Sequence, residues 1–247
     1  MLELGPCGAA VIEPQLTTSS ELPCAPDTGD YVSVGRYPFV LCLAVPGDLD
    51  KVVGLVRGAA DWLGRKGIDQ WQKPWPDRAG QRERILNDLF KGKTWLVQDG
   101  KIIAATITID TDEPLDLDER PVWPPGENHQ AVLYLRRVIV SRRYARIGLG
   151  AGLLDWAADI AKRDYRAQVI RVDVRTTNRK LHTYYERQHF TRCRDPHGLG
   201  DYPAQALFER RVDAPGSDYS KLFMTAEGAR RAEVTLPSVP QPFSIKE

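Results

Sequence analysis

Apolar and polar positions alternate in regular patterns between residues 37 and 212 of this 247-residue chain. Period-2 or continuous apolar runs predict strands at 37–45, 94–98, 101–110, 131–140, 169–174, 190–194 and 204–212. Helical spacing of apolar residues predicts helices at 48–67, 79–90, 149–161 and 179–188. The order is βααβββαβαββ, which predicts an α/β (α+β) fold: a mixed central sheet of about seven strands with helices on both faces.

Local residue signals predict several element ends and faces. Asp48 is of the type that caps a helix N-terminus, just before the first helical run. In the second helix, Leu89 and Phe90 fall on the face expected to point inward. Asp99 followed by Gly100 predicts a tight hairpin between two strands.

Composition divides the chain into a domain with an extension at each end. Residues 1–35 and 214–247 are richer in Pro, Gly, Ser or Thr and show little periodicity, so we expect extensions around a domain at 36–213. A weak helical pattern runs over Met224–Arg231 in the second extension.

The chain's charge and composition argue against several classes of protein. A formal net charge of +1 gives no reason to expect a nucleic-acid partner. No apolar run is long enough to span a membrane, and the N-terminus shows no secretory signal. The cysteines form no Cys-x-x-Cys pair and join no histidine pair at metal spacing; they are Cys7, Cys24, Cys42 and Cys193. We therefore expect a reduced, cytoplasmic protein without a metal.

A glycine loop lies between an apolar strand and a long amphipathic helix. Gly148 and Gly150 would let an anion approach the unpaired N–H groups at the start of that helix. Three nearby cations, Arg142, Arg143 and Arg146, suit a ligand rich in phosphate. A Gly-x-Gly pair alone more often marks a turn, but the strand before it and the helix after it favour an anion site.

The segment 133–190 resembles the GNAT superfamily of acyl-coenzyme A N-acetyltransferases, in a bacterial, actinobacterial-like form. The family's Gln/Arg-x-x-Gly-x-Gly/Ala signature matches at Ala145, Gly148 and Gly150. Its Asn and Tyr-Glu-Lys-x-Gly-Phe pattern matches Asn178 and Tyr185-Glu186-Arg187-Gln188-His189-Phe190. The sequence departs from the family pattern at two positions. Ala145 stands where the family has Gln or Arg, and the neighbouring Arg146 can supply the missing charge. His189 stands where the family has Gly, in a turn. The resemblance covers roughly residues 37–212 and implies the same element order.

The resemblance implies acetyl-CoA as cofactor, held by a splayed strand and the glycine loop. The cofactor-binding residues it implies are Val138, Ile139, Val140, Ala145, Arg146, Ile147, Gly148, Leu149, Gly150, Ala151 and Asn178. A backbone N–H of Val138 or Ile139 would donate to the thioester oxygen. Without the glycine loop that follows it, the same apolar strand would be interpreted as an ordinary strand of the buried core.

Tyr185 is the expected general acid, because a phenol is protonated at neutral pH and can donate to a leaving thiolate. Tyr184 is an equally good packing residue, and the family spacing selects Tyr185. Asn178 would both cap the helix and contact the cofactor. The general base stays open among Glu127, His129, Asp173 and, through water, Tyr134.

Aromatic residues suggest where the acceptor amine binds. Trp71 and Trp75 lie where relatives line the acceptor pocket, and Tyr134 is a third candidate wall. The acids between 110 and 119 could attract a cationic acceptor or be only a solvated loop. The leading hypothesis is acetylation of a small primary amine by direct attack in a ternary complex. A protein N-terminus or lysine as acceptor, or a non-catalytic acyl-CoA-binding module, are the alternatives, and a homodimer is common in the family.

Overall fold

The computed structural model describes residues 39–74, 76–113, 123, 131–193, 205–216 and 223–225. The strands are β1 (Phe39–Leu43), β2 (Thr94–Asp99), β3 (Ile102–Asp110), β4 (Val132–Val140), β5 (Val169–Arg175), β6 (Thr191–Arg192), β7 (Gln205–Arg211) and β8 (Phe223–Thr225). The helices are α1 (Leu49–Gly64), α2 (Arg78–Phe90), α3 (Leu149–Asp164) and α4 (Arg179–Arg187), with 3₁₀ turns η1 (Pro46–Asp48) and η2 (Arg142–Tyr144).

The strands form one mixed sheet in the spatial order β6-β7-β5-β4-β3-β2-β1-β8. β4 and β5 are parallel, and β1 pairs in parallel with β8, whereas the other neighbours are antiparallel. The predicted order βααβββαβαββ is therefore confirmed for β1 to β7. The eighth strand was not predicted: residues 223–225 pair with β1, where the pattern had favoured a helix from Met224.

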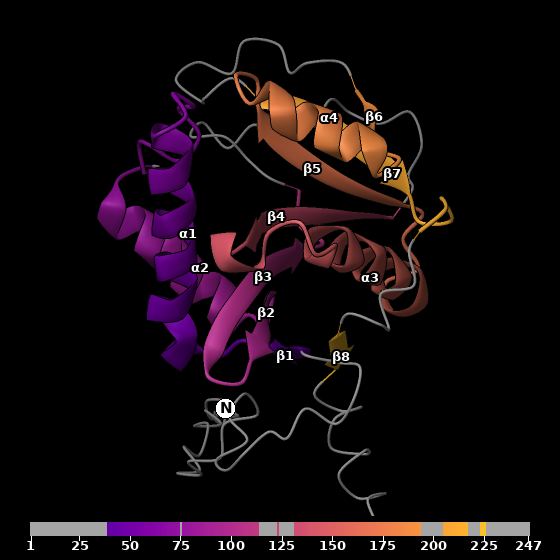
Figure 1. Ribbon diagram of the computed structural model, residues 1–247. Helices are drawn as coiled ribbons and strands as arrows, with labels where there is room; N and C mark the ends of the chain where they lie inside the picture. Colours follow the sequence, from indigo (N-terminus) through magenta and orange to yellow (C-terminus); the bar gives the residue numbers. More distant parts are fainter. Residues whose placement is uncertain are drawn as a thin grey trace, which may run out of the picture.

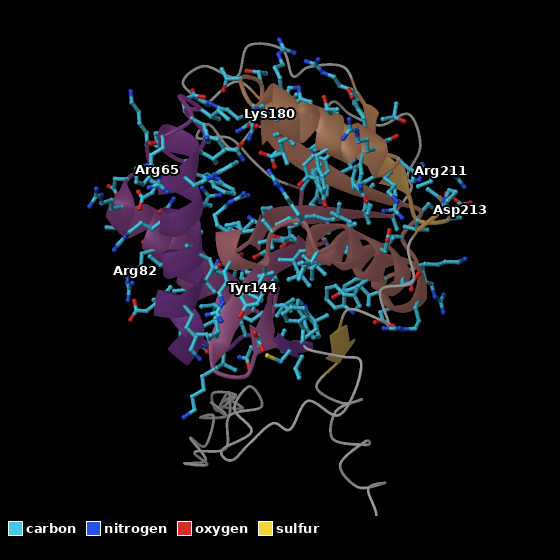
Figure 2. All side chains as sticks on the ribbon, in the orientation of Figure 1. Arg65, Arg82, Tyr144, Lys180, Arg211 and Asp213 are labelled. Carbon is cyan, nitrogen blue, oxygen red and sulfur yellow. The ribbon has the colours of Figure 1, made fainter. Side chains whose placement is uncertain are left out.

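Helices cover both faces of the sheet and bury two separate apolar clusters (Figure 1). On one face, α3 contributes Leu153 and Leu154 to the larger cluster, and Tyr185 of α4 packs into the same cluster. On the other face, Val52 of α1 and Leu89 of α2 close a second cluster. Charged side chains project from the outside of these layers, as Figure 2 shows for Arg65, Arg82 and Lys180.

A β-bulge interrupts β4 at Arg137. Thr106 pairs with Ile139 and Thr108 with Arg136, so two residues of β4, Arg137 and Val138, lie opposite the single residue Ile107. Arg137 has a φ of 50°, which is rare for a residue with a side chain and fits a bulge. The bulge reverses the alternation of β4, so that Ile139 faces α1 and α2 although Leu135 faces α3.

β4 and β5 separate beyond the first half of their length. Their paired residues run only from Val132 with Val169 to Leu135 with Val172. The remainder of β4 pairs with β3, and the remainder of β5 pairs with β7 (Figure 1). A wedge therefore opens in the middle of the sheet, directly beside the bulge.

Two local expectations were wrong. Phe90, expected to point inward, is 71% exposed at the end of α2. Asp48 does occupy the N-cap position of α1, but its carboxylate accepts from Val45 N at 3.0 Å and from the Lys51 side chain at 2.7 Å, and from no backbone N–H of the helix. The Asp99–Gly100 hairpin is confirmed, with Gly100 at a φ of 56°.

Candidate active site

The start of α3 forms a loop that can receive an anion. Gly148 is the N-cap at a φ of 87°, and the first backbone bond of the helix runs from Gly152 N to Gly148 O at 3.0 Å. The N–H groups of residues 149–151 consequently have no partner within the helix. Gly148 and Arg146 are exposed, and Gly150 and Ala151 are half-buried, so this end of the helix and a cation lie at the surface. A diphosphate fits this arrangement.

Gly150 allows the close approach of Tyr184 to this loop. A Cβ at position 150 would lie 2.7 Å from the Tyr184 hydroxyl and 3.6 Å from Val140 Cγ2. The loop, the end of β4 and α4 therefore meet at one point. Burial, followed by the charge of Asp155, raises the pKa of Tyr184 to about 12, so its hydroxyl keeps its proton.

A cleft of about 810 Å³ opens at the wedge, on the side of α1 and α2. Val138 of the bulge lines it from β4, and Tyr185 lines it from α4. Trp71, in the segment between α1 and α2, adds an aromatic wall and has a φ of 61°. The sequence places these three residues far apart, and the fold brings them to one cavity.

Tyr185 is held rigidly at the base of this cleft. Its ring makes edge contacts with Tyr184 at 5.5 Å and Phe190 at 5.2 Å between centroids, and a tilted contact with Phe208 at 6.1 Å. The residue is 5% exposed. Burial, together with Tyr184 and the negative charge of Asp173, raises the pKa of Tyr185 far above that of a free phenol. The phenol of Tyr185 therefore keeps its proton at neutral pH.

Asp173 of β5 lines the same cleft. Burial raises the pKa of its carboxyl, although its own backbone N–H and the charges of Arg136 and Arg84 act in the opposite direction. A carboxylate with a raised pKa is better matched to proton abstraction near neutral pH than an ordinary one. Because Asp173 also raises the pKa of Tyr185, the two groups are close enough to interact.

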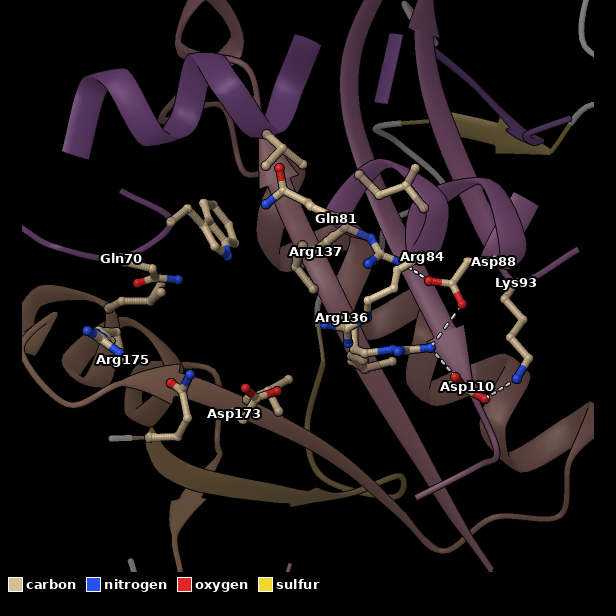
Figure 3. Close-up of a pocket in the computed structure, with 18 of the residues that line it drawn as sticks. Gln70, Gln81, Arg84, Asp88, Lys93, Asp110, Arg136, Arg137, Asp173 and Arg175 are labelled. Carbon is tan, nitrogen blue, oxygen red and sulfur yellow. Dashed lines mark hydrogen bonds and ion pairs between the residues drawn. The ribbon is translucent and has the colours of Figure 1, made fainter. Parts of the chain in front are cut away.

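A network of charges forms another wall of the cleft (Figure 3). Asp88 of α2 accepts from Arg136 at 3.2 Å and from Arg137, two adjacent residues that reach the same carboxylate. Neighbouring residues on a regular strand point to opposite faces, so the bulge is what permits this. Arg136 also bonds Asp110, which in turn accepts from Lys93. The side chains of Asp88 and Asp110 are almost fully buried.

Hydrogen bonds tie the loop after α1 to the start of α4. Asn178 Nδ2 donates to Gln70 Oε1 at 2.7 Å, while Asn178 Oδ1 accepts from Leu181 N at 3.3 Å and caps α4 as predicted. Asp69 accepts from Arg175 Nε at 2.9 Å and from Thr177. The Arg175 bond, then the Thr177 bond, lower the pKa of Asp69 to about 2, so this link persists at neutral pH.

Other predicted residues lie elsewhere. Tyr134 packs against Trp123 at 6.2 Å between ring centroids and is not among the described residues that line the cleft. Cys193 packs against the cluster of Trp123, Tyr134 and Leu207, and it too is not among the described residues that line the cleft. Trp75, Glu127 and His129 fall outside the described residues. The loop residues Ala145–Ala151 and the end of β4 do come together, as expected.

Sequence reasoning missed the charge network. Its signal was a pair of adjacent arginines, Arg136 and Arg137, inside an otherwise apolar strand. Charges in a buried strand need buried partners, and Asp88 and Asp110 supply them. The first acid of the stretch 110–119 is not part of a solvated loop. Asp110 is the last residue of β3, and its carboxylate forms ion pairs with Lys93 and Arg136.

Comparisons with known proteins agree with this geometry. Residues 58–190 match the model of the Acetyltransferase (GNAT) family. The chain is 30% identical over 177 residues, 71% of its length and 92% of the relative's, to the uncharacterized N-acetyltransferase YesJ of Bacillus subtilis (strain 168). The protein therefore belongs to the GNAT acetyltransferase family. Its likeness to actinobacterial members stays a prediction.

Solved structures share the fold. A GNAT-family acetyltransferase from Listeria monocytogenes 4b F2365 has a TM-score of 0.52 at 22% identity, covering 70% of this chain and 94% of its own. The PaiA N-acetyltransferase of Thermoplasma acidophilum, solved in complex with coenzyme A, has a TM-score of 0.52 at 14% identity, covering 70% and 98%. In the part of the chain described here, no helix is both long and apolar enough to cross a membrane.

Proposed function

We propose that this protein is an acetyl-CoA-dependent N-acetyltransferase that acts on a primary amine of a small molecule. The observation that carries the proposal is the convergence of three features at one wedge: the splayed strands β4 and β5, the N-terminus of α3 beside the end of β4, and Tyr185 in the lining of the cleft that opens there. No one of these features is specific, but together they suit a long thioester ligand.

The residues present fit coenzyme A. The free N–H groups of 149–151 and the cation of Arg146 would hold the diphosphate, with Gly148 and Gly150 leaving room for it. Val138 and Val140, on the part of β4 that β5 does not pair with, would accompany the pantetheine arm. The coenzyme A complex of the Thermoplasma relative supports this assignment. When bound, the thioester supplies an activated acetyl group.

Three groups of the chain would carry the transfer. Asp173 takes the proton that the amine loses as its nitrogen bonds to the acetyl carbon. The N–H of Val138, in the bulge, donates to the carbonyl oxygen as negative charge develops there. Tyr185 donates its proton to the departing sulfur. Cys193 is not among the described residues that line the cleft, which supports direct attack by the amine over an acyl-enzyme.

The cleft also supports a small acceptor over a protein segment. Trp71 walls it on one side, and the bonds of Gln70 to Asn178 and of Asp69 to Arg175 hold that wall against α4. A volume of about 810 Å³ is within the range of small-molecule sites.

The test is acetyl-CoA with a panel of primary amines, followed by release of free thiol and by the mass of the product. We expect thiol release that depends on the amine, with a product heavier by one acetyl group. Coenzyme binding without release on any amine would instead identify a non-catalytic acyl-CoA-binding module.

A further inference from the structure

The side chain of Arg137 holds its own backbone in a disfavoured conformation. The φ of 50° lies in the left-handed region, where a residue with a Cβ is strained. The guanidinium donates to the carboxylate of Asp88 on α2, and its Nε donates to Thr108 Oγ1 on β3 at 3.3 Å. The side chain of Arg137 is only 14% exposed, so little water is available to replace these bonds. Contacts from two different elements therefore fix this residue.

Both partners of Arg137 are buried and are themselves held in place. Thr108 Oγ1 shares a hydrogen bond of 2.9 Å with Thr94 Oγ1 on the neighbouring strand. Asp88 also accepts from Arg136 at 3.2 Å, and its carboxylate joins α2 to the two adjacent arginines of β4 (Figure 3). Breaking a buried ion pair costs more free energy than one residue in the left-handed region. The pair of Asp88 and Arg137 can therefore maintain the strain at the bulge.

The strained residue orients the backbone of the residue that follows it. The peptide unit joining Arg137 to Val138 is planar, so the backbone angles of Arg137 set the direction of the Val138 N–H. Arg137 and Val138 together lie opposite Ile107, and β5 pairs with β4 only as far as Leu135. Val138 also lines the cleft. The N–H assigned above to the thioester oxygen thus belongs to a peptide unit whose direction depends on Arg137.

We propose that Asp88 is a positioning residue for acetyl transfer: through Arg137 it holds the bulge that sets the direction of the Val138 N–H. This inference rests on the proposed function and adds a residue that acts through another. A donor stabilises a developing negative charge best when its direction is fixed before the reaction begins. The residues that hold such a donor are consequently as important as the donor itself.

Asp88→Asn tests the role, because it keeps the size of the side chain and removes its charge. Loss of a whole oxyanion donor slows turnover by about 100- to 1,000-fold, and a misdirected donor should cost part of that, so we expect kcat to fall by about 10- to 100-fold. KM for the amine and the midpoints of the pH–rate profile should stay nearly unchanged. In free protein labelled with ¹⁵N-valine, the amide signal of Val138, assigned with Val138→Ile, should shift.

A glycine at position 137 should rescue this variant, since glycine adopts a φ of 50° without strain and needs no anchor. The double variant Asp88→Asn/Arg137→Gly should recover most of the lost kcat and return the Val138 amide signal toward its wild-type position. Asp88→Asn/Arg137→Ala is the matched comparison: it removes the same guanidinium, keeps a Cβ and should stay slow. Neither double variant leaves the charge of Arg137 buried alone, so the comparison holds even if Asp88→Asn is too unstable to purify.

Asp155→Asn controls for the loss of a buried ion pair. Asp155 lies on α3, on the other face of the sheet, and accepts from Arg210 at 2.7 Å. Its side chain is 7% exposed, as is that of Asp88. Asp155→Asn should lower the melting temperature as Asp88→Asn does, but kcat should be unchanged.

Several outcomes would overturn the inference. A normal kcat in Asp88→Asn, or equal rates in the glycine and alanine double variants, would reject the positioning role and leave the acetyltransferase intact. A displaced pH–rate profile without rescue by glycine would show that Asp88 acts through its charge on titrating groups of the cleft, which also rejects it. Absence of thiol release from the wild type with every amine would reject the proposed function itself, and the role of Asp88 with it.

Discussion

The hydroxyl of Tyr184 occupies the space into which a side chain at Gly150 would project: a Cβ there would lie 2.7 Å from the oxygen. An alanine at this position would therefore require the Tyr184 side chain of α4 to shift. The loop proposed to bind the diphosphate is therefore shaped by a residue thirty-four positions later in the sequence as well as by its own glycines.

This contact predicts that a substitution at Tyr184 will rescue a substitution at Gly150. Gly150→Ala should push Tyr184 and the first turn of α3 apart, at a cost of about 1–3 kcal/mol in stability or coenzyme affinity. Tyr184→Phe removes the hydroxyl, so the double variant should recover most of that loss. The melting temperature and the dissociation constant of coenzyme A measure it. A double variant as impaired as Gly150→Ala alone would show that the clash is not the cause.

Tyr185→Phe should slow turnover by about 100- to 10,000-fold, because the variant lacks the proton for the leaving sulfur. Coenzyme affinity should be nearly unchanged, since the ring contacts to Phe190 and Phe208 remain. Because burial raises the pKa of Tyr185, the wild-type rate should not decline from loss of this proton between pH 7 and 9. Tyr165→Phe, at an exposed tyrosine, is the control. A normal rate in Tyr185→Phe would reject its role.

Asp173→Asn should abolish most activity and yet stabilise the protein at neutral and higher pH. The pKa of Asp173 is raised in the folded state, so the folded protein binds a proton more tightly than the unfolded chain. Stability from this group is present at low pH and is lost as pH rises through the folded pKa. The asparagine variant does not lose this stability, because its side chain carries no charge at any of these pH values. Thermal unfolding at pH 5 and pH 8 should show the larger gain at pH 8; equal melting temperatures at pH 8 would argue against a strained carboxylate.

His189→Gly should stabilise the protein by about 0.5–1 kcal/mol. His189 has a φ of 64°, in the left-handed region where a side chain is costly and glycine is not. The matched control is Gln188→Gly in the same turn, where φ is −94° and glycine brings only its entropic cost. Denaturant unfolding should move the two variants in opposite directions. A loss of stability in both would mean that the imidazole contributes more than its backbone costs.

The elements that followed local signals could be predicted from sequence. Gly148 marks the start of α3, Asn178 caps α4, and the Asp99–Gly100 turn joins two strands, because each signal acts within a few residues. The burial of Phe90 was wrongly predicted because its helical spacing matches the inward face. Phe90 is the last residue of α2, and none of the described residues covers it there.

The parts of the site that depend on strand register could not be predicted. The bulge at Arg137 arises from how β4 pairs with β3, and its arginine finds Asp88 forty-nine residues earlier in the chain. No periodicity encodes such a partner. The adjacent arginines in an apolar strand were the one available sign that a buried charge network would be needed.

Calorimetric titration with coenzyme A determines whether the wedge between β4 and β5 and the start of α3 form one coenzyme site. We predict one site per chain with a dissociation constant in the range of about 1 µM to 1 mM, weakened in Gly148→Val because valine strains at a φ of 87°. Absence of binding heat at millimolar coenzyme A, or equal affinity in the Gly148→Val variant, would contradict the account.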